Sequence, residues 1–222
     1  TDYTVAYENN ENATEEAKVK VTILNKNYQG SLEKTFVILP KTLTNDSISY
    51  IARQTYTGSE IKPAIEVKDG DKVLKLGTDY TVAYENNINA SDSALVKVTV
   101  LNKNYQGSPG KAFVIQPKTL TNDNISAIAD QTYTGEAITP VIEVKDGDKV
   151  LELGTDYTVA YESNTNATEE ALVKVTVVNK NYQGSLEKTF VILPKIITPA
   201  IELAAPVKNA VPQTTVETNE YT

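Results

Sequence analysis

The chain of 222 residues contains no cysteine, histidine, methionine or tryptophan. Without histidine it lacks the commonest general base and metal ligand, and without cysteine it has neither a thiol nucleophile nor a disulfide framework. No apolar run approaches the roughly 18 residues that a membrane-spanning helix needs. The formal net charge of −8 argues against nucleic acid and anionic lipid as partners. We therefore expect a protein that is not an enzyme and that uses no cofactor or metal.

What the sequence does contain is a repeat of 77 residues. Lys41–Pro117 and Lys118–Pro194 align without a gap and differ at 18 of their 77 positions. Residues 1–40 match only the C-terminal half of such a repeat, and residues 195–222 are interpreted as a linker or as the start of a different module. A fixed period of this length indicates an array of structural modules. We expect the chain to be a piece of a longer array.

Each repeat has the local signals of strands and turns. Alternating apolar and polar residues predict strands at Asp79–Tyr84 and Ala94–Leu101, and Phe113 and Ile115 continue the pattern in a last strand. The dipeptide Asp69-Gly70 predicts a tight hairpin. Its arms are expected at Ile65–Lys68 and Lys72–Leu76, other strands at Ser47–Ile51 and Gln54–Thr57, and linkers at Lys41–Ser47 and Lys118–Asn124. Six or seven short strands per repeat, with no helical period, predict an all-β string of small β-sandwiches.

The repeats resemble the immunoglobulin-like repeats that occur in tandem in surface and secreted proteins of Gram-positive bacteria. The motifs that carry the resemblance are Gln54-Thr-Tyr-Thr-Gly58, Ile61-x-Pro63, Val67-x-Asp-Gly70, Leu74-x-x-Gly-Thr-Asp-Tyr80, Val82-x-Tyr84-x-Asn-Asn87, Asn104-Tyr-Gln-Gly107 and Phe113-x-Ile115, with the same run from Gln131 to Ile192. The resemblance implies immunoglobulin-like sandwich modules arranged end to end. It also implies an extracellular location, on the cell surface or secreted. It does not specify a role, because such modules occur beside adhesins and glycan-degrading enzymes alike.

One segment, which we call the recurrent loop, is identical in all three copies: Asn25–Gly30, Asn102–Gly107 and Asn179–Gly184. An exposed tyrosine flanked by amides could stack on a sugar ring while the amides bind its hydroxyls. Alternatively, the tyrosine packs on the core or on the next module, which is the interpretation we favour. The candidate residues for ligand binding or inter-module contact are Asn102, Asn104, Tyr105, Gln106, Asn179, Asn181, Tyr182 and Gln183.

Other motifs have simpler explanations. Asp69-Gly-Asp71 and Asp146-Gly-Asp148 could supply oxygen ligands to calcium, but a hairpin turn already accounts for them. A lysine crosslink would need a lysine in the apolar core, and alternation places Lys97 and Lys174 on the polar side of their strand. The Asn-x-Ser/Thr triplets at Asn12, Asn45, Asn89 and Asn166 match the acceptor signal for N-glycosylation, which carries little information in a bacterial protein.

The positions that differ between the full repeats suggest a structural role. Tyr50/Ala127 and Arg53/Asp130 change size or charge, whereas the predicted core pair Phe113/Phe190 does not change. Our leading hypothesis is a spacer or stalk that projects another domain from a bacterial surface, with neighbouring repeats of the same chain as its partners. One alternative is weak, multivalent binding of host glycan or protein. Another is an accessory region of a secreted carbohydrate-active enzyme.

Overall fold

The computed structural model describes residues 2–198, Ile201–Leu203 and Thr214–Val216. These residues contain strands and two short 3-10 helices but no α-helix, which confirms the all-β prediction. No helix in the described part of the chain is long and apolar enough to cross a membrane. The chain divides into two compact units. Unit 1 comprises Thr1–Thr119 with Lys180–Gln183, and unit 2 comprises Leu120–Asn179 with Gly184–Thr222.

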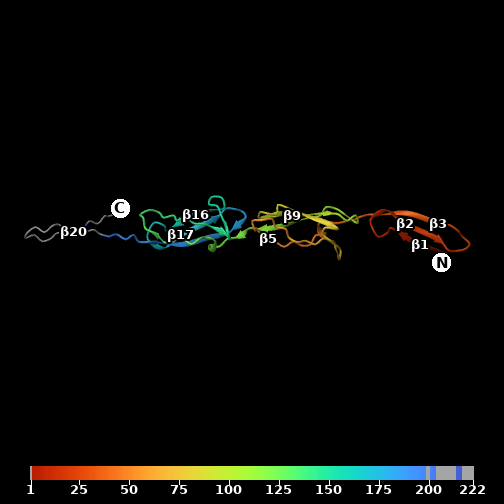
Figure 1. Ribbon diagram of the computed structural model, residues 1–222, viewed down its shortest axis with the longest axis horizontal. Helices are drawn as coiled ribbons and strands as arrows, with labels where there is room; N and C mark the ends of the chain where they lie inside the picture. Colours follow the sequence, from red (N-terminus) through yellow and green to blue (C-terminus); the bar gives the residue numbers. More distant parts are fainter. Residues whose placement is uncertain (1, 199–200, 204–213, 217–222) are drawn as a thin grey trace, which may run out of the picture. The chain divides into compact units, whose positions relative to one another are not determined.

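The first copy, in unit 1, forms a three-stranded antiparallel sheet. Its strands β1 (Tyr3–Glu8), β2 (Thr14–Ile23) and β3 (Ser31–Ile38) pair in the order β1-β2-β3 and lie side by side (Figure 1). Within residues 2–40 only Ala17 is a buried hydrophobic side chain. Tyr3 is 52% exposed here, whereas its equivalent Tyr80 in the next copy is 3% exposed. The half-repeat therefore has the sheet but not the residues that cover it in a complete repeat.

The second copy adds those residues and forms a four-stranded sheet in the order β5-β11-β9-β8. The strands are β5 (Gln54–Thr55), β8 (Tyr80–Glu85), β9 (Ser91–Val100) and β11 (Gly110–Gln116). The pairs β8–β9 and β9–β11 are antiparallel, and β5–β11 is parallel. In β9 the inward residues Val96 and Val98 are buried and Lys97 between them is exposed, as the alternation predicts.

The Asp-Gly hairpin forms, with shorter arms and a different turn centre from those predicted. β6 (Lys68–Asp69) and β7 (Lys72–Val73) pair antiparallel, with Asp69 opposite Lys72. The two central turn residues are therefore Gly70 and Asp71, and of these only Gly70 has a positive φ, +58°. A positive φ at the first central position alone is the requirement of a type II′ turn.

The segment around Lys41–Ile51 differs from the prediction. Lys41–Ser47 is not a linker, because β4 (Lys41–Thr42) pairs in parallel with β10 (Tyr105–Gln106), and the next residue, Leu43, is 3% exposed. Ser47–Ile51 is not a strand either. It begins at the end of a 3-10 helix, η1 (Asn45–Ser47), and then makes a single bridge from Ile48 to Val67. The polar composition that suggested a linker reflects this helical turn, with Asp46 in it.

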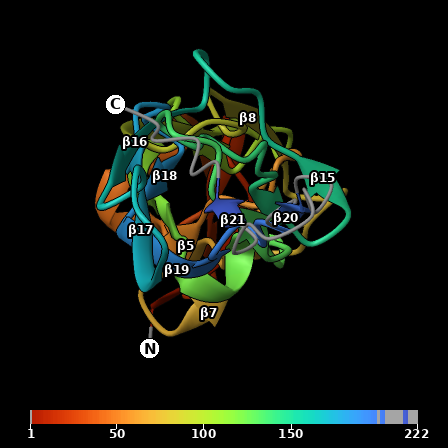
Figure 2. The same ribbon diagram turned by 90° about the vertical axis from the view of Figure 1, so that its left-hand side faces the viewer.

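Corresponding elements recur in the last repeat. In unit 1, β12 (Lys118–Thr119) pairs in parallel with β18 (Tyr182–Gln183), so the predicted linker at Lys118–Asn124 is also wrong. In unit 2, β13 (Gln131–Thr132), β19 (Ser185–Leu193), β17 (Thr168–Val177) and β16 (Tyr157–Glu162) form a four-stranded sheet in that order, and β17 and β19 are seen together in Figure 2. The remaining elements are η2 (Asn122–Asn124), the hairpin β14 (Lys145–Asp146) and β15 (Lys149–Val150), and the pair β20 (Ile201–Leu203) and β21 (Thr214–Val216).

The core of unit 2 lies between its four-stranded sheet and the first half of the repeat. Ile138, Ala171, Phe190 and Ile192 form a buried cluster, and Tyr161 packs its ring edge-on to Phe190 at 6.4 Å. The hydroxyl of Tyr161 donates a hydrogen bond to a backbone carbonyl across the core, at Pro140. The tail Ala205–Pro212, which we interpreted as the opening of a different module, lies outside the described residues.

Candidate functional site

The recurrent loop of the second copy is fixed at its base by Asn102. The side-chain amide of Asn102 donates to Asp79 Oδ1 at 2.6 Å, and its side-chain oxygen accepts from Asn104 N at 2.9 Å. The other carboxylate oxygen, Asp79 Oδ2, accepts from Lys75 N at 2.7 Å. Because these hydrogen bonds favour the charged form, with the one from Asn102 the largest contribution, the pKa of Asp79 is lowered. Asn102 is therefore a structural residue that ties the loop to the sheet.

Asn104 extends from the loop to the preceding copy of the repeat. Its side-chain oxygen accepts a hydrogen bond from Ala13 N at 2.7 Å, and its Nδ2 donates to Asn12 Oδ1 at 2.7 Å. Both partners belong to a turn that we call the Asn-Ala turn, which recurs as Asn89–Ala90 and Asn166–Ala167. One side-chain amide therefore uses both its donor and its acceptor on a single turn of another repeat, and Asn12, Ala13 and Asn104 all belong to unit 1.

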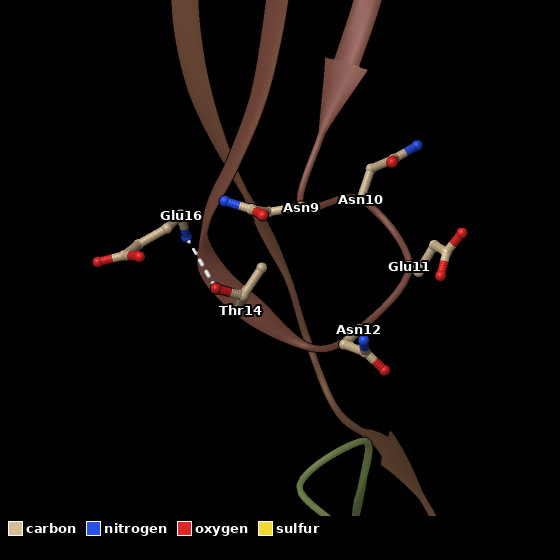
Figure 3. A pocket seen from close by; sticks show the side chains of 6 residues that line it. All are labelled: Asn9, Asn10, Glu11, Asn12, Thr14 and Glu16. Atoms are coloured by element: carbon tan, nitrogen blue, oxygen red, sulfur yellow. Dashed lines mark hydrogen bonds between the residues drawn. The ribbon is translucent and has the colours of Figure 1, made fainter.

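The Asn-Ala turn of the first copy is part of a loop that lines an open polar surface pocket of about 540 Å³. Figure 3 shows Asn12 in this loop, and shows the Thr14 hydroxyl accepting a hydrogen bond from Glu16 N at 3.1 Å. That bond holds the chain where it leaves the turn and enters β2. The turn therefore presents Asn12 and Ala13 N in a defined geometry to the incoming asparagine.

Tyr105 is not available as a stacking platform. It is 8% exposed, and Lys72 of the β6–β7 hairpin lies over its ring with Nζ 5.5 Å from the ring centroid. Its hydroxyl donates to Asp69 Oδ2 at 3.3 Å and accepts from Lys72 Nζ at 3.2 Å. The ammonium group of Lys41 contacts the same carboxylate, and its hydrogen bond is the main reason that the pKa of Asp69 is lowered. The aspartate that could have been a calcium ligand is thus engaged by a lysine and a tyrosine.

Gln106 and Gly107 attach the end of the loop to β4 and the residue that follows it. Gln106 Nε2 donates to Thr42 Oγ1 at 3.0 Å, and Leu43 N donates to Gln106 O at 2.9 Å. Gly107 has a φ of +111°, and a Cβ there would lie 2.6 Å from Leu43 O. Glycine is required at this position for two reasons: the backbone conformation and the close approach of Leu43.

The third copy of the loop contacts the Asn-Ala turn of the second copy of the repeat in the same way as Asn104 contacts that of the first. Asn181 accepts from Ala90 N at 2.8 Å and donates to Asn89 Oδ1 at 3.0 Å. Tyr182 is 4% exposed and packs its ring edge-on to Tyr56, with 5.3 Å between ring centroids. These residues also lie together in unit 1. The remaining candidates, Asn179 and Gln183, donate to Asp156 Oδ1 at 2.6 Å and to Thr119 Oγ1 at 3.0 Å, as Asn102 and Gln106 do with their equivalents.

The structure therefore separates the eight candidate residues into two groups. Asn102, Gln106, Asn179 and Gln183 hold the loop in its own repeat. Asn104, Asn181 and Tyr182 contact the preceding repeat, whereas Tyr105 contacts the hairpin of its own repeat.

Sequence reasoning did not identify the surface that receives the loop. The Asn-Ala turn was considered only as a glycosylation triplet, and Tyr56 only as part of the predicted strand Gln54–Thr57 and of the motif Gln54–Gly58 that carries the resemblance. The available signal was that both recur in register with the loop: Asn-Ala at residues 12, 89 and 166, and Tyr56 again as Tyr133. Sequence alone does not show that these residues of one copy meet the loop of the next.

The geometry gives little support to calcium binding or to a lysine crosslink. No cluster of three or more acidic side chains placed to hold a metal occurs among the described residues. Lys97 and Lys174 lie on the polar side of their strands, as predicted, and pair with Glu85 and Glu162 at 2.6 and 2.7 Å. No buried side-chain nitrogen or oxygen in the described part lacks a hydrogen-bond partner.

Comparison of the chain with protein-family models, with curated proteins and with solved structures found no match.

Proposed function

We propose that the chain is a spacer made of tandem immunoglobulin-like β-sandwich repeats, belonging to an extracellular bacterial protein and holding another domain away from the surface. The observation that carries the proposal is the engagement of Asn104 and Asn181. The only six-residue loop that is unchanged in three copies is used, in both cases where a preceding repeat is described, to contact that repeat. A loop kept for connecting repeats fits a spacer.

The binding alternative, in which the recurrent loop holds host glycan, is less well supported. Stacking on a sugar needs an open aromatic face, and Tyr105 and Tyr182 are 8% and 4% exposed. The loop amides that would bind sugar hydroxyls already have partners in the protein. No specific observation favours the alternative of an accessory region of a carbohydrate-active enzyme.

The experiment that tests the spacer function is small-angle X-ray scattering on arrays of the Lys41–Pro194 type, extended by one repeat at a time. A compact module of 77 residues has a diameter on the order of 30 Å. A spacer with stiff junctions increases its maximum dimension by a nearly constant step of about that size for each added repeat. Growth with the square root of the repeat number would mean a flexible chain of modules and would contradict the proposal.

A matched pair of variants tests whether the recurrent loop determines the stiffness of the junctions between repeats. Asn181→Ala removes both hydrogen bonds to the Asn-Ala turn, whereas Lys180→Ala changes an exposed neighbour in the same loop. We expect the first change, introduced at every junction, to broaden the distance distribution and the second to leave it unchanged. Equal profiles for the two variants would show that the loop does not determine junction stiffness.

A further inference from the structure

The strand with which the chain leaves the second repeat is paired in the same direction as a strand near its start. β5 pairs in parallel with the last two residues of β11, Ile115 and Gln116. The residue after β5, Tyr56, donates from its backbone N to Gln116 O at 2.9 Å. We call this pairing the exit clamp, because the chain passes to the next repeat directly after it, at Pro117.

The strand with which the chain enters the second repeat is also held in a parallel pair, between β4 and β10. Lys41 N donates to Asn104 O and Leu43 N donates to Gln106 O, both at 2.9 Å. The side chain of Gln106 adds a hydrogen bond to Thr42 Oγ1 at 3.0 Å. We call this pairing the entry clamp.

The parallel direction of both clamps determines how they meet tension along the chain. In a parallel pair the N-terminal end of one strand and the C-terminal end of the other lie at opposite ends of the pair. Tension through the ends of the repeat pulls β5 from its N-terminal side and β11 from its C-terminal side. The same holds for β4 and β10, because the chain continues from β10 into β11. Both pairs are therefore sheared, and their hydrogen bonds carry the load together. In an antiparallel pair of first and last strands the bonds would open one after another.

Buried apolar side chains cover both clamps. Leu43 is 3% exposed in the entry clamp, and Tyr56 and Ile115 are 6% and 1% exposed in the exit clamp. An exposed backbone hydrogen bond can be exchanged for one to water at little net cost. Opening either clamp instead exposes apolar surface while the bonds break.

The third repeat has clamps of the same kind. β13 pairs in parallel with the end of β19, and Tyr133 N donates to Leu193 O at 2.9 Å. β12 pairs in parallel with β18, and Lys118 N donates to Asn181 O at 2.9 Å. Only Pro117 separates the exit clamp of the second repeat from the entry clamp of the third. Tension therefore passes from one clamp to the next without a length of unpaired chain between them.

We propose that these clamps make each complete repeat a force-bearing module, which stays folded while the chain is pulled through its ends. Resistance to tension is a property of each repeat, whereas the spacer function depends on the junctions between repeats. Either can therefore fail without the other.

The test is single-molecule force spectroscopy on the full chain with two attachment geometries. The chain contains no cysteine, so a substitution to cysteine gives a unique point of attachment. In the first geometry the chain is held at its two ends. In the second it is held at Ser59→Cys and at the C-terminal end. Ser59 is exposed and follows β5. The second geometry therefore pulls β5 from the same end of the pair as Pro117, and the exit clamp opens bond by bond. The third repeat is still sheared.

The length released by each unfolding event identifies the repeat. An extended residue spans about 3.3–3.6 Å, so a repeat of 77 residues with a folded length of about 30 Å releases roughly 220–250 Å. Held at Ser59, the second repeat releases at most about 210 Å, because only residues 59–117 are under load. We expect two long steps in the first geometry. In the second we expect a short step at a lower force than the long step of the same molecule. Equal forces for the two steps, or a higher force for the short one, would overturn the proposal.

A matched pair of variants tests the exit clamp of the third repeat in the first geometry. Tyr133→Pro removes the N–H that donates to Leu193 O, whereas Tyr133→Ala removes the same ring and keeps the donor. Proline favours an extended residue before it, and Thr132 is already in a strand. We expect the proline variant to unfold one of its two repeats at a lower force than the alanine variant does. Two long steps in a trace show that both repeats were folded. Equal forces in the two variants would contradict the role of the clamp, and if the proline variant shows one step only, the Ser59→Cys comparison, which leaves every clamp residue unchanged, decides.

Discussion

Removing the side chain of Asn87 should destabilise the second copy of the repeat, and the chain contains its own control for this change. Asn87 is 6% exposed, and its Nδ2 donates to Ile61 O at 3.1 Å, while Ile61 N donates to Asn87 O at 2.8 Å. Asn87→Ala leaves the backbone bond but deprives the Ile61 carbonyl of its side-chain donor. Loss of the partner of a buried polar group costs about 1–3 kcal/mol.

The size of the effect can be measured by calorimetry. For a domain of this length each 1 kcal/mol shifts the melting temperature by roughly 4–8 °C, so a loss of about 2 kcal/mol shifts the transition of this copy by roughly 8–16 °C. The equivalent change in the third copy, Asn164→Ala, removes the matching bond to Ile138 O at 2.9 Å and should have a similar effect.

The control is Asn10→Ala in the first copy. Asn10 stands in the same Glu-Asn-Asn sequence as Asn87 but is exposed, so the change should alter the free energy of unfolding by no more than about 0.5 kcal/mol. If Asn87→Ala and Asn10→Ala shift the transition equally, or if neither does, the buried hydrogen bond to Ile61 does not have the role assigned to it.

Two further predictions follow from the loop and its base. Gly107→Ala should lower the free energy of unfolding, measured in urea, by about 1–3 kcal/mol because of the close contact with Leu43 O. Gly30→Ala also places a side chain at a positive φ, but in open surroundings, so the difference between the two variants measures the contact with Leu43. Equal losses in the two variants would refute this role of the contact. The folded-state pKa of Asp79 lies below its ordinary value of 3.8, so its stabilisation is present above that pH and is lost as the pH falls through the lower folded-state pKa. Asn102→Ala should reduce this loss when unfolding is measured as a function of pH, and an unchanged pH dependence would show that Asn102 is not the cause.

Period-two alternation predicted the long strands because their two faces meet different environments. β8 and β9 were located within a few residues, since Val96 and Val98 face the core and Lys97 faces solvent. The two-residue strands were predicted less well, because a strand of that length has no period. The Lys41–Thr42 strand is defined by its pairing with Tyr105–Gln106, some 64 residues further along the chain, and no local pattern encodes that partner.

The recurrent loop shows most clearly why the candidate site could be located but not interpreted from sequence. Its tyrosine has the same neighbours along the chain in all three copies, yet it is 70% exposed at Tyr28, 8% at Tyr105 and 4% at Tyr182. The difference comes from residues distant in sequence: Lys72 and Asp69 of its own repeat for Tyr105, and Tyr56 of the preceding repeat for Tyr182. A single loop sequence thus has an exposed or a buried aromatic ring according to which distant residues, of its own repeat or of the preceding one, surround it. What the loop does is therefore decided by the residues, distant along the chain, that are packed around it.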